Sequence, residues 1–586
     1  MLHQVFAQKP ELLGHAVEVL DQNKEERLKT SVDLLWQVLI TAAEDPRAGE
    51  IVCILDALDE CRHSELIPLL QKLCSFYGER SRISSNMALK FLVTSRPLQH
   101  IESEFSDLSR EIPAIRLAGE EHTDEILYET GLVIEYEIEK MQREFSMHPK
   151  TVRILRNEFT KVENRTYLWL MLIFDLIRQD LQSVMTSTER EKLFHTIPKS
   201  VDTAYTAILN KSTNKDRARK LLKIVCAATR PLSVMEITTA LLIQENHKTY
   251  DDLEIPPDGF PKTYIRNLCG LFVSVIDGRV FLLHQTAKEF LMAKEDYNNS
   301  AIRLPRDEIW KNSVTIRDSS YVLASVCMWF LRLEEFKSSS MGQGGIDQLI
   351  AKYEFLKYSA DNWAIHFRAA AVPDDDPLVH LAFKFCDDQV NRHLSYMLVI
   401  PQIIEYYSVI ADALHSLLVA SYLGLESVVG QLLSTPNVVG INVADDGGRA
   451  PLWYAGSEGH EAVVGRLLAA PGIDVNSADE YGETPLSQAA YFGHDAVVGQ
   501  LLAAPGIDVN SADKYSKTSP LSQATYRGHD AVVGQLLAAP GIDVNSADKY
   551  GQTPLWQAAY CGHEAVVDQL LAAPGIDVNA ADKDGK

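Results

Sequence analysis

The feature that most constrains this chain of 586 residues is a repeat in its C-terminal third. Gly424, Gly459, Gly493, Gly528 and Gly562 follow one another at intervals of 35, 34, 35 and 34 residues, taken as differences of successive numbers. The last four open the phrase Gly-His-[Glu/Asp]-Ala-Val-Val, and each copy continues to Leu-Leu-Ala-Ala-Pro-Gly-Ile-Asp-Val-Asn. A period of this length predicts a solenoid, in which no unit buries its apolar face without a neighbour.

Each unit is predicted to consist of two short helices and a hairpin. Thr484-Pro485-Leu486 places Thr at an N-cap and Pro at the first helical position, where the missing N–H costs nothing. Gly493 then supplies a left-handed residue that ends this helix. The apolar residues of Ala496 to Leu502 form one face of a second helix, which Pro505-Gly506 stops. The stretch around Asp508-Val509-Asn510 belongs to the hairpin.

Through Thr-Pro-Leu, Gly-His, Val-Val-x-x-Leu-Leu and Asp-Val-Asn, residues 411–586 resemble the ankyrin-repeat family. The resemblance implies about five repeats, the last followed by a partial one, with a protein ligand on the concave face. It departs from the family where His normally follows Thr-Pro-Leu, so a hydrogen bond to the neighbouring turn is in doubt there. Those positions are Trp453, Ser487, Ser522 and Trp556.

The third full unit carries one extra residue, and Ser516 stands where the family has Gly. A non-glycine residue with positive φ costs roughly 1 kcal/mol. We therefore expect a local bulge at this hairpin.

Residues that vary between otherwise identical units are not needed by the common fold. Ala496 to Asp513 is identical to Ala531 to Asp548, and the hairpin tips and the ends of the first helices are among the positions that vary. Tyr and Arg are common anchors of protein interfaces. We hypothesise that these positions line a binding face; the alternative is that an exposed Tyr only covers its neighbour. The candidates are Tyr481, Tyr491, Phe492, Tyr515, Tyr526, Arg527, Tyr550 and Tyr560.

Composition excludes several classes of ligand. The formal net charge of −24 disfavours a nucleic acid as partner. The eight Cys show no Cys-x-x-Cys spacing, so neither a zinc site nor a disulfide framework is predicted. The chain does not open with a signal peptide, and its most apolar run, Tyr167 to Phe174, is too short to span a bilayer. We expect a cytoplasmic protein without a membrane partner.

Two strands are predicted near the N-terminus, each followed by polar side chains. The apolar run Ile51 to Leu55 precedes Asp56, Asp59 and Glu60, and the run Leu89 to Val93 precedes Thr94-Ser95-Arg96-Pro97. Continuous apolar runs are typical of parallel strands buried on both faces, and such sheets bind ligands at the carboxyl ends of their strands. Carboxylates and an Arg at this edge suit a magnesium nucleotide. A solvated sheet edge is the alternative.

Together the two segments resemble the Walker B and sensor segments of a NACHT domain, from a class of signalling NTPases common in fungal regulatory proteins. The resemblance implies ATP or ADP with Mg²⁺ as cofactor. Asp56 would hold the metal, Asp59 or Glu60 would act on the attacking water, and Arg96 would sense the γ-phosphate. No Gly-x-x-x-x-Gly-Lys-[Ser/Thr] occurs. We therefore expect the phosphate loop upstream, a sheet with exposed apolar faces, and no nucleotide hydrolysis by this chain alone.

Residues 103–195 are predicted to be helical. Asn164 to Trp169 stands where the NACHT family usually has a Gly or Pro against the adenine, and this departure weakens the adenine binding that the resemblance implies. Residues 196–300 resemble its winged helix: Ser233 caps a helix with Glu236, and Leu268 to Val275 pairs with Val280 to Leu283 around Asp277-Gly278. The resemblance implies that His284 contacts the β-phosphate of ADP in a closed state. A His that only caps or packs is the alternative.

The predicted fold class is multidomain, α/β plus α. It comprises a partial NTPase sheet (1–102), a helical domain (103–195), a winged helix (196–300), a helical connector (301–410) and an ankyrin solenoid (411–586). Tyr358, Asn362, Trp363 and His366 of the connector are predicted to pack. The predicted function is the protein-binding part of a NACHT-type receptor in non-self recognition or regulated cell death, with self-assembly through the NACHT segment. A nucleotide-switched NTPase and an ankyrin adaptor with a relic NACHT segment are the alternatives.

Overall fold

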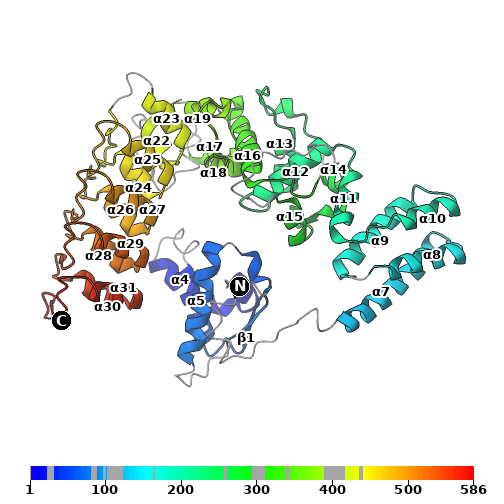
Figure 1. Ribbon diagram of the computed structural model, residues 1–586, viewed down its shortest axis with the longest axis horizontal. Helices are drawn as coiled ribbons and strands as arrows, with labels where there is room; N and C mark the ends of the chain where they lie inside the picture. Colours follow the sequence, from blue (N-terminus) through cyan, green and yellow to red (C-terminus); the bar gives the residue numbers. More distant parts are fainter. Residues whose placement is uncertain are drawn as a thin grey trace. The chain divides into compact units, whose positions relative to one another are not determined.

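A computed structural model describes residues 2–22, 32–61, 63–80, 89–96, 101, 123–162, 165–256, 260–292, 310–336, 343–387, 416–434 and 440–585. The chain divides into two compact units, Met1–Leu132 and Val133–Lys586 (Figure 1). Among the described residues, no helix combines the length and the apolar character needed to cross a membrane.

The first unit contains a two-stranded parallel sheet. β1 (Ile51–Leu55) pairs with β2 (Leu89–Val93) in the register Ile51↔Leu89 to Leu55↔Val93, so the predicted strands and their parallel pairing are confirmed. Trp36 stacks on Phe91 with ring centroids 5.6 Å apart. The helices of this unit are α1 (Leu2–Gln8), η1 (Pro10–Leu12), α2 (Gly14–Gln22), α4 (Val32–Glu44), η2 (Leu58–Glu60) and α5 (His63–Arg80).

Within the described residues, only one face of this sheet is covered. Cys53 and Leu89 are buried, whereas Val52, Ile54 and Leu92 are 55%, 64% and 54% exposed. The prediction that both faces are buried is therefore wrong for the described structure. Successive side chains of a strand point to opposite faces, and the buried core of this unit lies on one of them. The expected exposure of apolar side chains is confirmed.

The helical segment after the first unit runs from α7 (Thr123–Glu144) through α8 (Pro149–Thr160) and α9 (Tyr167–Leu181) to α10 (Ser187–His195). The next segment contains α11 (Val201–Asn210), α12 (Lys215–Ala227), α13 (Val234–Leu242), α14 (Phe260–Cys269), β3 (Val273–Ile276), β4 (Arg279–Leu282) and α15 (Gln285–Leu291).

The local predictions for this second segment are mostly confirmed. Ser233 and Glu236 form a capping box at the start of α13. β3 and β4 are antiparallel around Asp277 and Gly278, which have φ of 49° and 75°, as a tight hairpin turn of type I′ requires. The predicted hairpin was too long, because Leu268 and Cys269 form the last turn of α14.

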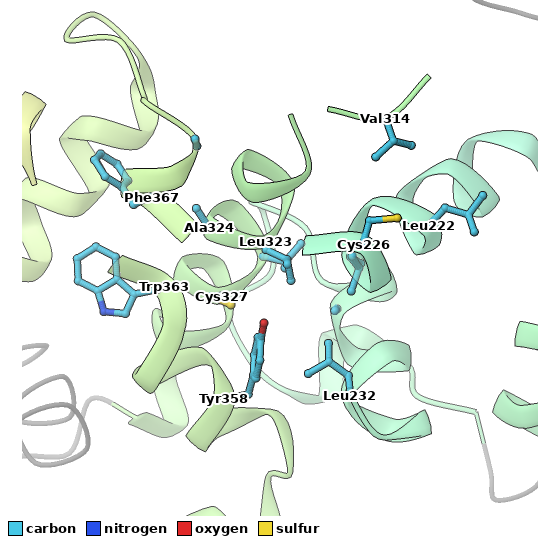
Figure 2. Packing of buried hydrophobic residues seen from close by; sticks show 14 of the residues in the cluster. Leu222, Cys226, Leu232, Val314, Leu323, Ala324, Cys327, Tyr358, Trp363 and Phe367 are labelled. Atoms are coloured by element: carbon cyan, nitrogen blue, oxygen red, sulfur yellow. The ribbon is translucent and has the colours of Figure 1, made fainter. Parts of the chain in front are cut away.

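The connector consists of α16 (Ile316–Leu331), η6 (Glu334–Phe336), α17 (Gln343–Lys352), α18 (Phe355–Ala369) and α19 (Pro377–Asp387). Tyr358, Asn362, Trp363 and His366 are buried, as predicted for packing residues. Figure 2 shows Tyr358 of α18 in one core with Cys327 of α16 and side chains of α12. The boundaries predicted at residues 195, 300 and 410 stay predictions. One cluster of buried residues includes side chains before and after each of these positions, so it separates no domains there.

The C-terminal helices form what we call the repeat array, residues 416–585. The first helices of its units are α22 (Ser416–Tyr422), α24 (Pro451–Ser457), α26 (Pro485–Phe492), α28 (Pro520–Arg527) and α30 (Pro554–Cys561). The second helices are α23 (Glu426–Ser434), α25 (Glu461–Leu468), α27 (Asp495–Leu502), α29 (Asp530–Leu537) and α31 (Glu564–Leu571). Each pair stacks on the next, from yellow to red in Figure 1.

Glycine ends the first helices as predicted. Gly493 has φ of 78°, and a Cβ there would lie 2.7 Å from the ring of His529 in the next unit. The position therefore requires glycine both for its backbone conformation and for the close approach of the neighbouring imidazole.

Two recurring side chains, an Asn and a His, hold neighbouring units together. Asn476 Nδ2 donates to the carbonyl of Gly506 at 2.8 Å, and its Oδ1 accepts from the backbone N–H of Asp508 at 2.9 Å. His494 Nε2 lies 2.9 Å from the carbonyl oxygen of Ser457. The same bonds recur at Asn442, Asn510 and Asn545 and at His460, His529 and His563.

Two predictions about departures from the repeat pattern needed correction. The positive φ of the third hairpin, 55°, falls on Lys517 and not on Ser516, because the extra residue shifts the left-handed position along the chain. The hydrogen bond in doubt after Thr-Pro-Leu is present at Trp453, whose Nε1 donates to the Glu483 carbonyl at 3.1 Å. At Ser487 the hydroxyl instead completes the capping box of its own helix.

Candidate functional site

The variable positions of the array lie on one row of hairpin tips and on the ends of the first helices; we call this surface the variable rim. Backbone bonds fix each tip to the one before it. The N–H of Lys514 donates to Tyr481 O at 2.8 Å, and that of Lys549 donates to Ser516 O at 2.8 Å. Within the tips, buried aspartates accept backbone N–H groups: Asp479 Oδ1 accepts from Tyr481 at 3.0 Å. The rim is therefore a fixed surface rather than a set of independent loops.

Most aromatic side chains of the rim face solvent. Tyr560 is 76% exposed, Tyr515 65%, Tyr550 57%, Tyr526 54% and Phe492 50%. Exposed aromatic side chains at one rim are typical of protein interfaces.

The remaining rim aromatics contact their neighbours. Tyr481 is half-buried, with its ring centroid 5.9 Å from that of Tyr515, so the alternative that a Tyr covers its neighbour describes this residue best. The guanidinium of Arg527 lies 4.1 Å from the centroid of the half-buried Tyr491. Such contacts hold large side chains in place, which lowers the entropy that binding would cost.

The polar residues predicted at the sheet edge do come together in the first unit. Thr94 Oγ1 hydrogen-bonds Asp56 and accepts from the N–H of Ala57 at 2.9 Å. The Arg96 backbone N–H and Nε donate to the two carboxylate oxygens of Asp59 at 3.0 and 2.5 Å. Glu60 lies in η2, and its side chain is outside the described part, as is Pro97.

The pair of Arg96 and Asp59 alters what this edge can do. Burial acts to raise the pKa of Asp59, but the backbone and side-chain hydrogen bonds from Arg96 outweigh it and leave the pKa lowered. The side chain of Asp59 is only 4% exposed. The predicted water-activating acid and the predicted phosphate sensor therefore bind each other in this structure.

The residues present supply part of a magnesium-nucleotide site. One carboxylate such as Asp56 suffices when phosphates complete the coordination of Mg²⁺. Within the described residues, however, no cluster of three or more His, Cys, Asp or Glu side chains could hold a metal ion, and the sequence has no Gly-rich loop to hold phosphates. The fit is incomplete, and no hydrolytic step follows from these residues.

His284 begins α15 as an N-cap, with its side chain accepting from the N–H of Thr286 at 3.2 Å. It also lines a cavity of about 580 Å³ together with Thr166 and Leu168 at the start of α9. His284 and the segment that stands at the family's adenine position thus line the same cavity, although Asn164 is outside the described residues. Lys311 and Asp202, which also line the cavity, form an ion pair at 2.5 Å.

A family model for ankyrin repeats matches residues 417–513 and 500–582. Residues 417–582 are ankyrin repeats. A model for the winged helix domain of GPI inositol-deacylase matches residues 205–303, which confirms the predicted winged helix. A model for the N-terminal region of nephrocystin 3, a NACHT-related domain, matches residues 1–96.

One relative, the vegetative incompatibility protein HET-E-1 of Podospora anserina, is 23% identical over 330 residues. The match covers 55% of this chain and 23% of the relative, so this chain spans under a quarter of that protein's length. The predicted combination of a NACHT-related segment, a winged helix and ankyrin repeats is therefore confirmed. Ankyrin repeats indicate protein–protein interaction.

Proposed function

We propose that the variable rim of the ankyrin array binds a protein partner, and that the chain serves as the recognition part of a NACHT-type signalling protein. One observation carries the proposal. In units that are otherwise near copies of one another, the tips and the ends of the first helices differ, and most of the aromatic side chains there are exposed.

The signalling context rests on the comparisons. The segment before the array resembles NACHT-related and winged-helix domains, and the relative from P. anserina is a vegetative incompatibility protein. Non-self recognition and regulated cell death are the processes that we propose for the chain. The cytoplasm is its proposed location, and self-assembly through the NACHT-related segment is part of the same proposal.

The test replaces Tyr491, Tyr526 and Tyr560 together by Ala in the whole chain. Proteins captured from the cells that express the natural protein are quantified against the unchanged chain. We expect capture to fall at least roughly tenfold, since large aromatic side chains at an interface typically contribute more than 1 kcal/mol each.

A matched control replaces three exposed tyrosines outside the array, Tyr128, Tyr136 and Tyr167, which are 70%, 61% and 52% exposed. Circular dichroism of both variants shows whether the fold is kept. Equal capture by the unchanged chain and the rim variant would exclude the rim as the binding surface.

A second candidate function, a nucleotide-controlled switch, is favoured by the cavity beside His284. We propose that ADP occupies this cavity in a form of the protein that also carries a phosphate loop. His284→Ala should then release ADP from that form, whereas His148→Ala, which removes another histidine cap, should not. Unchanged ADP retention would show that His284 acts only as a helix cap.

A further inference from the structure

The first residue of each hairpin tip occupies an equivalent position in every unit of the ankyrin array. In four tips the carbonyl of the preceding Asp accepts a backbone N–H from the end of the turn, for example from Gly482 to Asp479 and from Gly551 to Asp548 at 3.0 and 2.9 Å. In the third tip, which carries the extra residue, Asp513 Oδ1 accepts from the N–H of Ser516 at 2.6 Å instead. Because the first position directly follows this Asp in every tip, its side chains can be compared along the array. From the first tip to the last they are Asp446, Glu480, Lys514, Lys549 and Lys583.

The sign of the charge at this position therefore changes once, between the second and the third tip. All five side chains are exposed. Lys517 and Arg527 add further exposed positive charge near the third and fourth tips, whereas the exposed Asp584 stands beside Lys583 at the fifth. A local run of cations is notable in a chain whose net charge is −24.

Within the described residues, no ion pair joins Lys514, Lys549 or Lys583 to an Asp or Glu. Lys514 Nζ donates to a backbone carbonyl, that of Glu480, at 3.1 Å, and Lys549 Nζ lies 5.0 Å from the ring centroid of Tyr550. An ammonium has three N–H donors, so these contacts leave donors for a partner.

We propose that an acidic protein segment binds along the tips of the third to fifth units, with its carboxylates on Lys514, Lys549 and Lys583. This inference rests on the proposed protein-binding function of the rim and specifies the chemistry of the partner. Tyr515 and Tyr550, each next to a lysine in the chain, contact the apolar parts of the same segment. The carboxylates of Asp446 and Glu480 at the first two tips repel the acidic segment, so the bound segment ends before it reaches them.

A protein segment is favoured over a nucleic acid by the electrostatics of the whole chain. A net charge of −24 repels a long polyanion, whose affinity depends on neutralising many phosphates. A short acidic segment needs only the local cations. Stacked helices lie about 10 Å apart, and a segment in the polyproline II conformation advances about 3.1 Å per residue with three residues per turn, so every third side chain faces the next lysine.

The probe is a fluorescein-labelled peptide of twelve residues with Glu at every third position, measured by fluorescence anisotropy against the whole chain. We expect binding that weakens as the salt concentration rises, because exposed ion pairs are screened. The variant Lys514→Glu, Lys549→Glu and Lys583→Glu should lower the affinity roughly tenfold or more. The control variant Lys150→Glu, Lys215→Glu and Lys384→Glu makes the same change of net charge outside the array and should keep the affinity.

Three outcomes would overturn the proposal: no binding of the peptide, equal loss in both variants, or binding of a single-stranded oligonucleotide in place of the peptide. The tyrosine variant separates this proposal from the broader one. If capture of cellular proteins falls in the tyrosine variant but not in the lysine variant, the rim binds a protein that is not held by acidic side chains. If neither variant loses capture, both proposals are wrong.

Discussion

The ankyrin array and the sheet of the first unit both expose large apolar side chains, but at different kinds of position. In the array the exposed aromatics occupy tips and helix ends, where the backbone is held by bonds that every unit repeats. In the sheet, Val52, Ile54 and Leu92 are alternate residues of regular strands. Large apolar side chains that are exposed at variable positions, on a backbone held by repeated hydrogen bonds, indicate a binding surface. Exposure of alternate strand residues indicates instead a sheet with one uncovered face.

The largest effect should come from the shared interior of the array. Leu501 is fully buried between units, and Leu501→Ala should lower the free energy of unfolding by about 2–5 kcal/mol, since it leaves a cavity. Leu571 of the last second helix is 50% exposed, so Leu571→Ala should cost much less. Urea denaturation of both variants tests the difference. Equal costs would mean that the units do not share one interior.

Acid should weaken the second unit through histidines that are buried in the neutral form. Burial lowers the pKa of His366 to about 4, and His366 Nε2 lies 2.8 Å from Tyr358 Oη. A histidine in an unfolded chain has a pKa of about 6.5, so the unfolded state binds more protons between these values. This contribution to stability is complete above pH of about 6.5 and is lost as the pH falls towards about 4, by up to about 3 kcal/mol.

His460 should act in the same direction, because burial lowers its pKa to about 4 as well. The measurement is the free energy of unfolding at several pH values for the unchanged chain and for His366→Gln. The variant should lose stability less steeply on acidification. Parallel curves would show that His366 does not bind a proton on unfolding.

The bonds between units should matter less than the interior but remain measurable. Asn510→Ala removes the donor to Gly541 O and the acceptor for Asp543 N–H, both part of the link to the next unit. We expect a loss of about 1–3 kcal/mol in unfolding free energy. Asn579 is the matched control, because the described residues include no unit after its own. A loss as large for Asn579→Ala would show that the side chain acts within its own unit.

The smallest effect should come from the exposed face of the sheet. Val52→Thr keeps the β-branched shape of a side chain that is 55% exposed, so stability should change by no more than about 0.5 kcal/mol. Cys53→Ser, on the buried face of the same strand, should cost more. Thermal unfolding of the two variants compares the faces. A large loss for Val52→Thr would show that this face is covered in solution.

Predictions that depended on local patterns were accurate. The period of 34 to 35 residues predicted the repeat units, Thr-Pro and Ser-x-x-Glu predicted where helices begin, and Asp277-Gly278 predicted the hairpin turn. The helix-start and turn signals involve residues within one turn of one another, and the period repeats such local signals along the chain. The inter-unit roles of Asn476 and His494 were missed, although their recurrence along the array was the available signal.

Predictions that depended on what a side chain meets in space were less accurate. Arg96 and Asp59 were assigned to a phosphate and a water, yet they bind each other across 37 positions of the chain. Trp453 was expected to lose a hydrogen bond that the indole N–H makes with the next hairpin. His284 caps a helix and also lines a cavity together with Thr166. The capping role is confirmed, and the contact with the β-phosphate of ADP stays a prediction.

The sequence by itself determined the repeat units, the two parallel strands and the rim positions that vary, because these follow from periodicity and from the conformational preferences of Gly, Pro and capping residues. Only the tertiary structure decided which face of the sheet is covered and which polar groups pair at its edge. Pairing and burial depend on distances between residues far apart in the sequence, and no local pattern encodes those distances.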